Sequence, residues 1–532
     1  MSTFMHRLTK SDSLITKILF RLFYLLWLPL FAVLFSVSVY KYYNHKLFVV
    51  FLSVILWLIA LCLIMVFRDL INSLSDHTVY ILLSSISILM FIILFLAGRA
   101  MWVQPLNDTG TAYYAVGEIL RDGSISKEIN EYTMTYWSTN TSNHDYFLIY
   151  PNTTFLVFYQ LCYYRILRVF SPIDLYDTSG YTAAIVLNAV SITLAVIFGF
   201  LTAKKAKDNC TAFFFLILSF FFVPYYLHVF KVYSDTLSLP YVTAPLYFYV
   251  KGAQTDSGKK TLIYNILAGL LLSLGILVKG SIAILLIAVV IYTLLRPDTL
   301  KRTLSTLFCL ILVCFAILNI WSLYRDNCSW IDTSEADKYE FPSIHWVMMA
   351  AKGGSGYKTA DVEYSLSFST YAERKQADTE EFIRRVKSYN SAHDYIVYQI
   401  KKVSNVMANG LYAQSEHLET TFEAAPALAD WVSWQGKHYS KFYCYITIYI
   451  TFFYISMLIS AVLGIFRKKH ALTTLFNICF FGLMLFFSFW EFKSRYLLNF
   501  VPLFMLCSSF TISECAEIFK SFRKKHSLKT EN

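Results

Sequence analysis

Charged residues are scarce in this sequence. Asp, Glu, Lys and Arg make up 15% of its 532 residues, whereas 57% are hydrophobic and 18% aromatic, and the mean hydropathy is +0.50. This composition lies outside the range of soluble globular proteins and is typical of a protein that crosses a membrane several times. The net charge of +11 is carried mostly by short segments between apolar runs, so it indicates membrane topology rather than nucleic-acid binding.

The ten cysteines show no metal-ligand spacing. Most of them lie inside apolar runs, where a thiol behaves as a small hydrophobic group; examples are Cys62, Cys314, Cys479 and Cys507. We therefore expect neither a disulfide framework nor an obligatory cofactor or metal, with a divalent metal left as an open alternative. The sequence also lacks a small-residue cleavage site after its first apolar run, so this run is expected to remain as a span.

Long apolar runs dominate the chain. A helix needs about 20 consecutive apolar residues to cross the hydrocarbon core of a bilayer. The runs that reach or approach this length are residues 18–40, 47–67, 78–101, 180–202, 211–230, 236–250, 261–278, 281–295, 303–323, 441–466, 471–490 and 496–512. They predict an all-α polytopic membrane protein with about twelve transmembrane helices.

The segment 153–170 is apolar enough to suggest a further span, but it contains Gln160, Arg165 and Arg168. Its apolar side chains recur at helical spacing on one face and its polar ones on another, which favours an amphipathic helix lying in the membrane interface.

The distribution of basic loops supports this interpretation. With 153–170 kept out of the membrane, the strongly basic short segments fall on one face together with the basic N-terminus. These segments are Lys204-Lys205-Ala206-Lys207, Lys251 with Lys259-Lys260, Arg296 with Lys301-Arg302, Arg467-Lys468-Lys469, and Lys520 with Arg523-Lys524-Lys525. By the positive-inside rule we expect a multi-pass plasma-membrane protein with both termini in the cytoplasm.

This topology divides the chain into five parts. Residues 1–101 hold spans 1 to 3, and residues 102–179 form a first extracytoplasmic loop with interfacial helices. Residues 180–323 hold spans 4 to 9, residues 324–440 form an extracytoplasmic helical subdomain, and residues 441–532 hold the last three spans and a basic cytoplasmic tail. Within the subdomain, the apolar spacing along 378–398 predicts one helix.

Several charged or polar residues at span ends are expected on the outer face. Asp108 follows the third span; Lys231 and Asp235 lie between the fifth and sixth; Lys279 separates the seventh from the eighth; Glu491 and Arg495 lie between the last two. Cations of this kind neutralise a phosphate, and a carboxylate takes the proton of an attacking hydroxyl. A site for a phosphate-linked substrate is therefore predicted here, with the stretch 101–152 as its loop. We expect a raised pKa for its carboxylate unless Arg99 or Lys279 opposes the shift.

Each of these residues also has a structural interpretation. Asp108 and Asp235 stand where a helix cap would stand, and a cap needs only a short oxygen-bearing side chain. Lys231, Lys279 and Arg495 are placed as snorkelling anchors would be. Tyr150-Pro151-Asn152 fits a turn into the interfacial helix.

The order of these motifs resembles the class-C (GT-C) integral-membrane glycosyltransferases, the superfamily of the protein O-mannosyltransferases and the lipid A aminoarabinose transferase, and more closely a Gram-positive branch that decorates cell-wall polysaccharides. The motifs that carry the resemblance are Asn107-Asp108 with Tyr113-Tyr114, Tyr150-Pro151-Asn152, Tyr233-Ser234-Asp235-Thr236, Leu277-Val278-Lys279-Gly280-Ser281, His345-Trp346-Val347-Met348-Met349 with Gly353-Gly354-Ser355-Gly356-Tyr357 and Asp361, and Glu491-Phe492-Lys493-Ser494-Arg495-Tyr496-Leu497.

The resemblance implies transfer of one sugar, with inversion, from a polyprenyl-phosphate donor, without a nucleotide-binding domain. Carried over by position, it makes Asp108 the general base, Asp235 a second acidic position, and Lys279 and Arg495 the cations at the donor phosphate. The remaining substrate-binding candidates are Tyr150, Asn152, Lys231, Glu491 and His345. Because Asp108 stands between Asn107 and Thr109, the paired acidic residues of the protein mannosyltransferases are missing. A cell-wall polysaccharide or teichoic acid is therefore expected as acceptor rather than a protein, and no nucleic acid is expected as a partner.

Three other functions stay open. A lipid-linked glycan flippase or transporter has a similar number of spans, although the sequence shows neither two repeated halves nor broken midplane helices. A polysaccharide polymerase or ligase shares the topology and the donor chemistry. A non-catalytic scaffold explains least, because it gives no reason for polar residues to gather at the span ends of one face.

Overall fold

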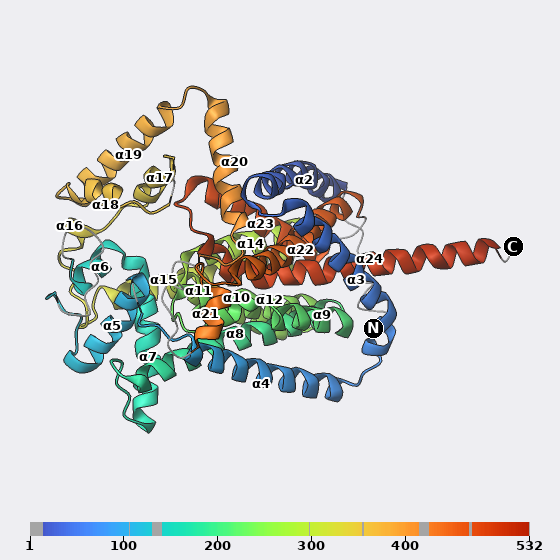
Figure 1. The fold of residues 1–532 in the computed structure, drawn as a ribbon, viewed down its shortest axis with the longest axis horizontal. Coiled ribbons are helices and arrows are strands. Elements are labelled where there is room, and N and C mark those ends of the chain that lie inside the picture. The colour runs from blue at the N-terminus through green and yellow to red at the C-terminus, as the bar shows by residue number, and fades with distance from the viewer. Residues whose placement is uncertain are drawn as a thin grey trace.

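The computed structural model describes residues 14–105, 107–129, 141–296, 298–353, 356–413, 425–467 and 471–530, and all regular secondary structure in these residues is helical. Among the residues singled out above, Gly354, Ser355, Lys468 and Lys469 lie outside the described ranges, as does the N-terminus before Leu14. The helices form one elongated body. The termini lie at one end of the long axis and the elements of the two predicted outer segments at the other (Figure 1).

Nine helices in the described ranges are long and apolar enough to cross a membrane. They are α2 (Leu14–Tyr42), α3 (Lys46–Asn72), α4 (Asp76–Ala100), α8 (Thr178–Ala206), α13 (Gly258–Val278), α15 (Leu300–Arg325), α22 (Tyr439–Phe466), α23 (Leu472–Phe489) and α24 (Val501–Thr530), the last preceded by the short helix η4 (Ser494–Phe500). Each coincides with a predicted apolar run. α24 is the most enclosed of the nine, with 94% of its apolar window buried by the other helices.

The other three predicted runs form shorter helices. The run 211–230 is divided into α9 (Asn209–Phe220) and α10 (Val223–His228), and the run 236–250 becomes α11 (Ser234–Leu237) and α12 (Pro240–Gln254). The run 281–295 becomes η2 (Gly280–Ile282) and α14 (Ala283–Leu295). Prolines in the first turn of α10 and α12 explain two of the breaks, because proline starts a helix easily but cannot continue one. The count of twelve spans therefore stays a prediction.

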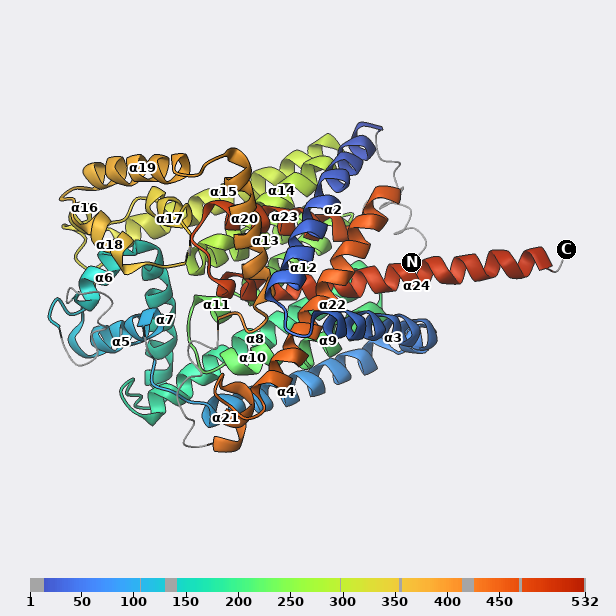
Figure 2. The same cartoon turned by 45° about the horizontal axis from the view of Figure 1, so that its top comes forward.

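The elements of the first predicted outer loop gather at the end away from the termini (Figures 1 and 2). They are α5 (Asn107–Asp122), α6 (Asn143–Ile149), η1 (Pro151–Thr153) and α7 (Thr154–Phe170). α7, the predicted interfacial helix, runs across the long axis rather than along it (Figure 1). It buries Leu156, Val157, Gln160 and Tyr164 and exposes Val169 and Phe170, so apolar side chains lie both on its enclosed face and at its exposed C-terminal end. The interfacial position of α7 stays a prediction.

The second predicted outer segment contains α16 (Ala336–Tyr339), α17 (Ile344–Ala350), α18 (Thr359–Leu366), α19 (Tyr371–Lys387), α20 (Ala392–Ala408) and α21 (Pro426–Val432). The single helix predicted over 378–398 is wrong, because the chain ends α19 at Lys387 and starts α20 at Ala392. The Ser391 side chain caps α20 by accepting a hydrogen bond from Asp394 N. α20 then leaves the outer subdomain and packs against α2, contributing Val403 and Met407 to the core between the spans.

Candidate active site

Five charged residues from four parts of the chain meet where the outer helices adjoin the spans. We call Asp108, Asp235, Lys279, Glu491 and Arg495 the charged cluster. Asp108 lies in the first turn of α5, Asp235 in α11, and Lys279 between α13 and η2; Glu491 and Arg495 lie beyond the end of α23. The breaks between helices at residues 234–240 and 278–283 position Asp235 and Lys279. A continuous helix through either segment would not place these two side chains at helix ends.

Arg495 and Asp108 form one ion pair of the cluster. Arg495 Nη2 donates to Asp108 Oδ2 at 2.8 Å, and the Tyr146 hydroxyl donates to Asp108 Oδ1 at 3.3 Å. The guanidinium also lies 5.2 Å from the ring centroid of Tyr233 and 5.6 Å from that of Tyr496. The Asp108 side chain keeps 26% of its surface exposed, against 12% for Arg495. Asp108 is thus held in place and still open to a ligand.

Lys279 and Asp235 form the second ion pair, which is more deeply buried. Lys279 Nζ donates to Asp235 Oδ1, and the two side chains are 8% and 3% exposed. Asp235 Oδ2 is buried and has no hydrogen-bond partner within the described chain. The ammonium of Lys279 also lies 5.3 Å from the Tyr496 ring centroid, so both cations lie near this ring.

Asn188 of α8 fixes the turn that carries Asp235. Its amide nitrogen donates to the backbone oxygens of Val229 and Lys231, at 2.9 and 2.7 Å, and its Oδ1 accepts from Thr236 at 2.6 Å. One buried side chain therefore satisfies three polar groups of the connection between α10 and α11. Asp235 is consequently held rigidly beside Lys279.

Glu491 differs from the two aspartates because no ion pair joins it to a cation among the described residues. Its Oε2 accepts from the Tyr496 hydroxyl at 3.3 Å, whereas its Oε1 is buried without a partner in the described residues. Burial raises the pKa of Glu491, and Lys493 and Arg495 only partly oppose this rise. Glu491 therefore holds a proton more readily than either aspartate.

The pKa of Asp108 is shifted the other way. Burial alone would raise it, but Arg495, Lys493 and Lys231 together hold the pKa below its usual value. The pKa of Asp235 is likewise lowered, since Lys279, Arg495 and Lys231 outweigh the effect of burial. The expectation of a raised pKa at the loop carboxylate was wrong for Asp108. The cation that opposes the shift is Arg495, whereas Arg99 donates to Thr182 at 2.8 Å.

The structure places the other candidates differently. Lys231 is buried near the cluster and lowers the pKa of both aspartates. Tyr150 is buried with its ring 4.8 Å from that of Tyr146, so it lies beside the residue that holds Asp108. Asn152 is exposed in η1, and no hydrogen bond in the described chain joins its side chain to the cluster.

His345 lies in the interior of the outer subdomain, away from the ion pairs. Its Nδ1 is 2.7 Å from Ser365 Oγ, which donates to Asp378 Oδ1 at 2.6 Å. The imidazole stacks on Phe341 with ring centroids 4.1 Å apart. Burial lowers the pKa of His345 to about 3, so the ring is neutral at ordinary pH. The role of His345 in binding stays a prediction.

Tyr146 and Lys402 were not candidates on sequence grounds. Tyr146 contacts Asp108, and Lys402 contacts the last turn of α23, just before Glu491 in the chain. Tyr146 lies within the stretch 101–152 but no motif distinguishes its hydroxyl from those of neighbouring tyrosines. Lys402 of α20 donates to the backbone oxygens of Ala350 and Ser488, both at 3.3 Å. In the described ranges no group of three His, Cys, Asp or Glu side chains is placed to hold a metal ion.

A family model described as "Conserved hypothetical integral membrane protein" matches residues 127–516. This chain belongs to that family. The assignment agrees with the nine candidate spans and establishes an integral membrane protein without naming an activity. No curated protein matches the chain.

Among solved structures, this integral membrane protein is similar to the oligosaccharyltransferase AglB from Archaeoglobus fulgidus in complex with an inhibitory peptide and a dolichol-phosphate. The identity is 13%, the TM-score 0.41, and the match covers 84% of this chain and 52% of that one, about half its length. It is also similar to ArnT from Cupriavidus metallidurans bound to undecaprenyl phosphate, at 12% identity and a TM-score of 0.34, covering 83% of this chain and 79% of that one. TM-scores below 0.5 do not establish a shared fold, and neither likeness assigns an activity.

Proposed function

We propose that this integral membrane protein is a glycosyltransferase of the GT-C type, which moves a single sugar from a polyprenyl-phosphate donor to a cell-wall polysaccharide or teichoic acid on the extracytoplasmic face of the plasma membrane. The observation that carries the proposal is the charged cluster at the ends of membrane-spanning helices. Its two cations suit a lipid-linked phosphate, and its partly exposed carboxylate suits an acceptor hydroxyl.

The proposed reaction is one displacement. The isoprenoid chain lies between spans, and Arg495 and Lys279 hold the donor phosphate. The acceptor hydroxyl gives its proton to Asp108, its oxygen forms a bond to the anomeric carbon, and the bond from that carbon to the phosphate oxygen breaks. Polyprenyl phosphate leaves with the electron pair. Attack and departure on opposite faces of the sugar invert the anomeric configuration.

The ion pair between Arg495 and Asp108 gives this reaction an order. While Arg495 neutralises Asp108, the pKa of the carboxylate is held low and it is a weak base. An incoming donor phosphate competes for the same guanidinium, and its negative charge lies close to Asp108. Both effects raise the pKa of Asp108 toward the range in which it accepts a proton. Donor binding therefore prepares the base, and the donor is expected to bind before the acceptor.

The test is a transfer assay in proteoliposomes, with radiolabelled polyprenyl-phosphate monosaccharides and a crude cell-wall acceptor. Asp108→Asn keeps the shape of the side chain but removes the base, and it should lower the transfer rate by on the order of 10²–10⁴. The matched control is Asp122→Asn, on the same helix, whose carboxylate is exposed and pairs with the adjacent Arg121. Full activity of Asp108→Asn would exclude Asp108 as the base.

The same assay separates the alternatives. Label that crosses the bilayer equally in wild type and Asp108→Asn, without reaching an acceptor, would identify a flippase or transporter. Transfer of a whole glycan, with monosaccharide donors inert, would identify a polymerase or ligase.

A further inference from the structure

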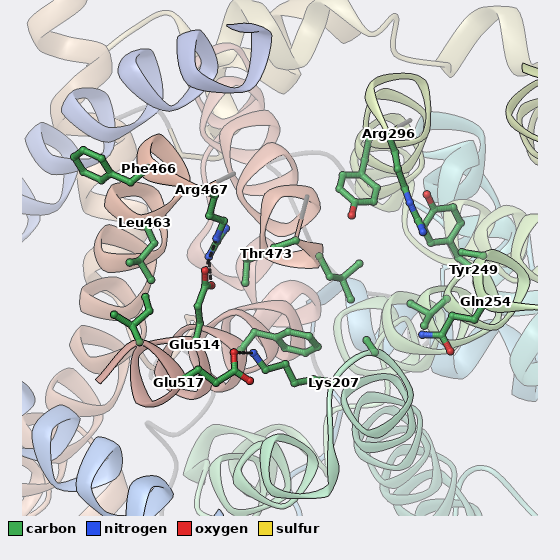
Figure 3. A pocket seen from close by; sticks show the side chains of 18 residues that line it. Lys207, Tyr249, Gln254, Arg296, Leu463, Phe466, Arg467, Thr473, Glu514 and Glu517 are labelled. Atoms are coloured by element: carbon green, nitrogen blue, oxygen red, sulfur yellow. Dashed lines mark hydrogen bonds and ion pairs between the residues drawn. The ribbon is translucent and has the colours of Figure 1, made fainter. Parts of the chain in front are cut away.

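A cavity with polar and apolar walls, drawn in Figure 3, lies at the ends of α12, α14 and α23 that face away from the charged cluster. α12 and α14 begin near Asp235 and Lys279 and end at this cavity, and α23 begins there and ends near Glu491. The cavity measures about 500 Å³. The basic loops that define the predicted cytoplasmic face adjoin it.

The cavity separates two groups of helices. The ends of α8, α12 and α14 contribute Lys207, Gln254 and Arg296 to its wall. The end of α22, the start of α23 and the middle of α24 form the other wall, where Arg467 and Glu514 point toward each other (Figure 3).

Two buried donors in this wall have no partner within the described chain. Arg467 donates through Nε to Glu514 at 2.7 Å and through Nη2 to the same carboxylate, but Nη1 remains unpaired although the side chain is only 10% exposed. The Thr473 hydroxyl is also unpaired and its residue is 1% exposed. A buried donor without an acceptor destabilises the fold, so a bound acceptor that pairs with both donors would stabilise the protein.

The N-terminus of α23 reaches the same cavity. Ala471 and Leu472, its N-cap and first residue, line the wall, and no side chain of the described residues caps this end. Thr474 N donates to Ala471 O at 2.9 Å, so the first turn presents the backbone N–H groups of Leu472 and Thr473 and the positive end of the helix dipole. An anion, above all a phosphate, is the ligand that such an end attracts.

The charge balance of the wall points the same way. Glu514 is neutralised by Arg467, and Glu517 by Lys207 at 3.0 Å together with Arg68. Arg296 forms no carboxylate ion pair in the described residues and lies beside Tyr249 (Figure 3). The wall therefore has a cation in excess.

Helix capping accounts for part of this pattern. Lys207, Arg296 and Arg467 are each the C-cap of their helix, where a cation interacts favourably with the dipole. Capping does not explain the unpaired Thr473 hydroxyl or the uncapped start of α23. Apolar side chains complete the wall beside these groups; they are Leu463, Phe466, Leu472, Phe510 and Ile518.

We propose that this cavity binds the phosphate group of an anionic lipid at the membrane face opposite the charged cluster. The phosphate accepts from Arg467 Nη1, the Thr473 hydroxyl and the first turn of α23, and Arg296 balances its charge. The apolar side chains hold the start of the acyl chains. The site is separate from the proposed active site and does not depend on the proposed reaction.

The test measures lipid binding to delipidated, purified full-length protein by native mass spectrometry and by the shift of the thermal unfolding midpoint. The probes are dioleoyl phosphatidic acid, dioleoylglycerol and inorganic phosphate. Phosphatidic acid should bind and raise the midpoint, and dioleoylglycerol, which lacks the phosphate, should do neither. Inorganic phosphate should compete with the lipid; if it raises the midpoint equally by itself, the site takes soluble phosphate and the anion-binding part of the proposal stands.

Two variants identify the site. Arg296→Gln and Thr473→Val should each weaken binding of phosphatidic acid at least about tenfold, the first by removing the balancing charge and the second by removing one hydrogen bond to a charged group. The matched control Lys251→Gln removes a cation from α12, at the same face but outside the cavity wall, and should leave binding unchanged.

Thr473→Val also distinguishes a binding role from a structural one. Replacing an unpaired buried hydroxyl by a methyl group should leave the ligand-free unfolding midpoint unchanged or raise it. Wild-type affinity in both Arg296→Gln and Thr473→Val, or equal binding of dioleoylglycerol, would overturn the proposal.

Discussion

Lys279 donates to only one oxygen of Asp235, and the other oxygen of this buried carboxylate has no partner in the described chain. The pair is therefore balanced in charge but incomplete in hydrogen bonding. Such an arrangement costs stability unless a further donor arrives, and a ligand hydroxyl is one group that would complete it.

Removing one member of this pair should be more damaging than removing both. Lys279→Met leaves Asp235 charged and buried, which typically costs about 3–5 kcal/mol, and should lower the thermal unfolding midpoint in detergent clearly. Adding Asp235→Asn should restore most of that loss without restoring transfer. Lys127→Met is the control, because it breaks an exposed pair with Asp332 and should leave the unfolding midpoint nearly unchanged. A stable Lys279→Met variant would contradict the buried pair.

Arg495→Lys should separate charge from geometry at the proposed donor site. Lysine keeps the positive charge but lacks the planar fork that donates to Asp108 while lying over the Tyr233 ring. We expect the KM for the polyprenyl-phosphate donor to rise about tenfold or more, which corresponds to about 1.4 kcal/mol of binding. Steady-state kinetics with varied donor measure this. The control is Arg165→Lys on the exposed face of α7. An unchanged KM would mean that Arg495 does not hold the donor.

Asp378 should make the stability of the outer subdomain depend on pH. Burial raises the pKa of Asp378 from 3.8 to about 6, although Ser365 and Arg374 oppose the rise. Between these values the folded protein binds more protons than the unfolded chain, so stability falls as pH rises through the folded pKa. The full effect is about 3 kcal/mol.

The measurement compares thermal unfolding midpoints at pH 4 and pH 7.5. Asp378→Asn mimics the protonated side chain, so its advantage over wild type should be larger at pH 7.5. Glu380→Gln, at an exposed position of the same helix, should show no such change. An equal difference at both pH values would show that Asp378 does not titrate in this window.

Gly464→Ala should disturb the packing of α2 against α22. A Cβ at Gly464 would overlap the ring of Tyr24, and Tyr24 is held in place by its hydrogen bond to Thr474 at 3.0 Å. Close packing at small residues stabilises helix pairs in membranes, and overpacking typically costs about 1–3 kcal/mol. A lower unfolding midpoint is expected. Gly258→Ala is the control, since no heavy atom outside its own helix turn lies within 4 Å of the position that its Cβ would take. Equal midpoints for the two variants would contradict the tight contact.

Hydropathy predicted the nine long helices closely, because a span must be apolar over its whole length whatever it packs against. It missed the breaks in the run 211–230 and before Pro240, since averaging over a run conceals a single proline. The apolar spacing along 378–398 also led to one predicted helix where the structure has two, α19 and α20. The helical spacing continues through residues 388–391, and only the cap at Ser391 marks the boundary.

The composition of the charged cluster was partly predictable. Asp108, Asp235, Lys279, Glu491 and Arg495 were identified because each stands at the edge of an apolar run. The pairing among them was not, because Asp108 and Arg495 are 387 positions apart and spacing carries no information over that distance. His345 was singled out by its motif, and its hydrogen bond lies with Ser365 in the subdomain, so its role in binding stays a prediction.

The same separation of 387 positions has a consequence for biosynthesis. A chain emerges from the ribosome from its N-terminus, and its early parts fold before the later ones exist. α5 and its carboxylate are therefore delivered to the membrane long before the segment that carries Arg495. Until that segment is inserted, Asp108 has no guanidinium to pair with. The charged cluster is therefore completed only when nearly the whole protein has been synthesised.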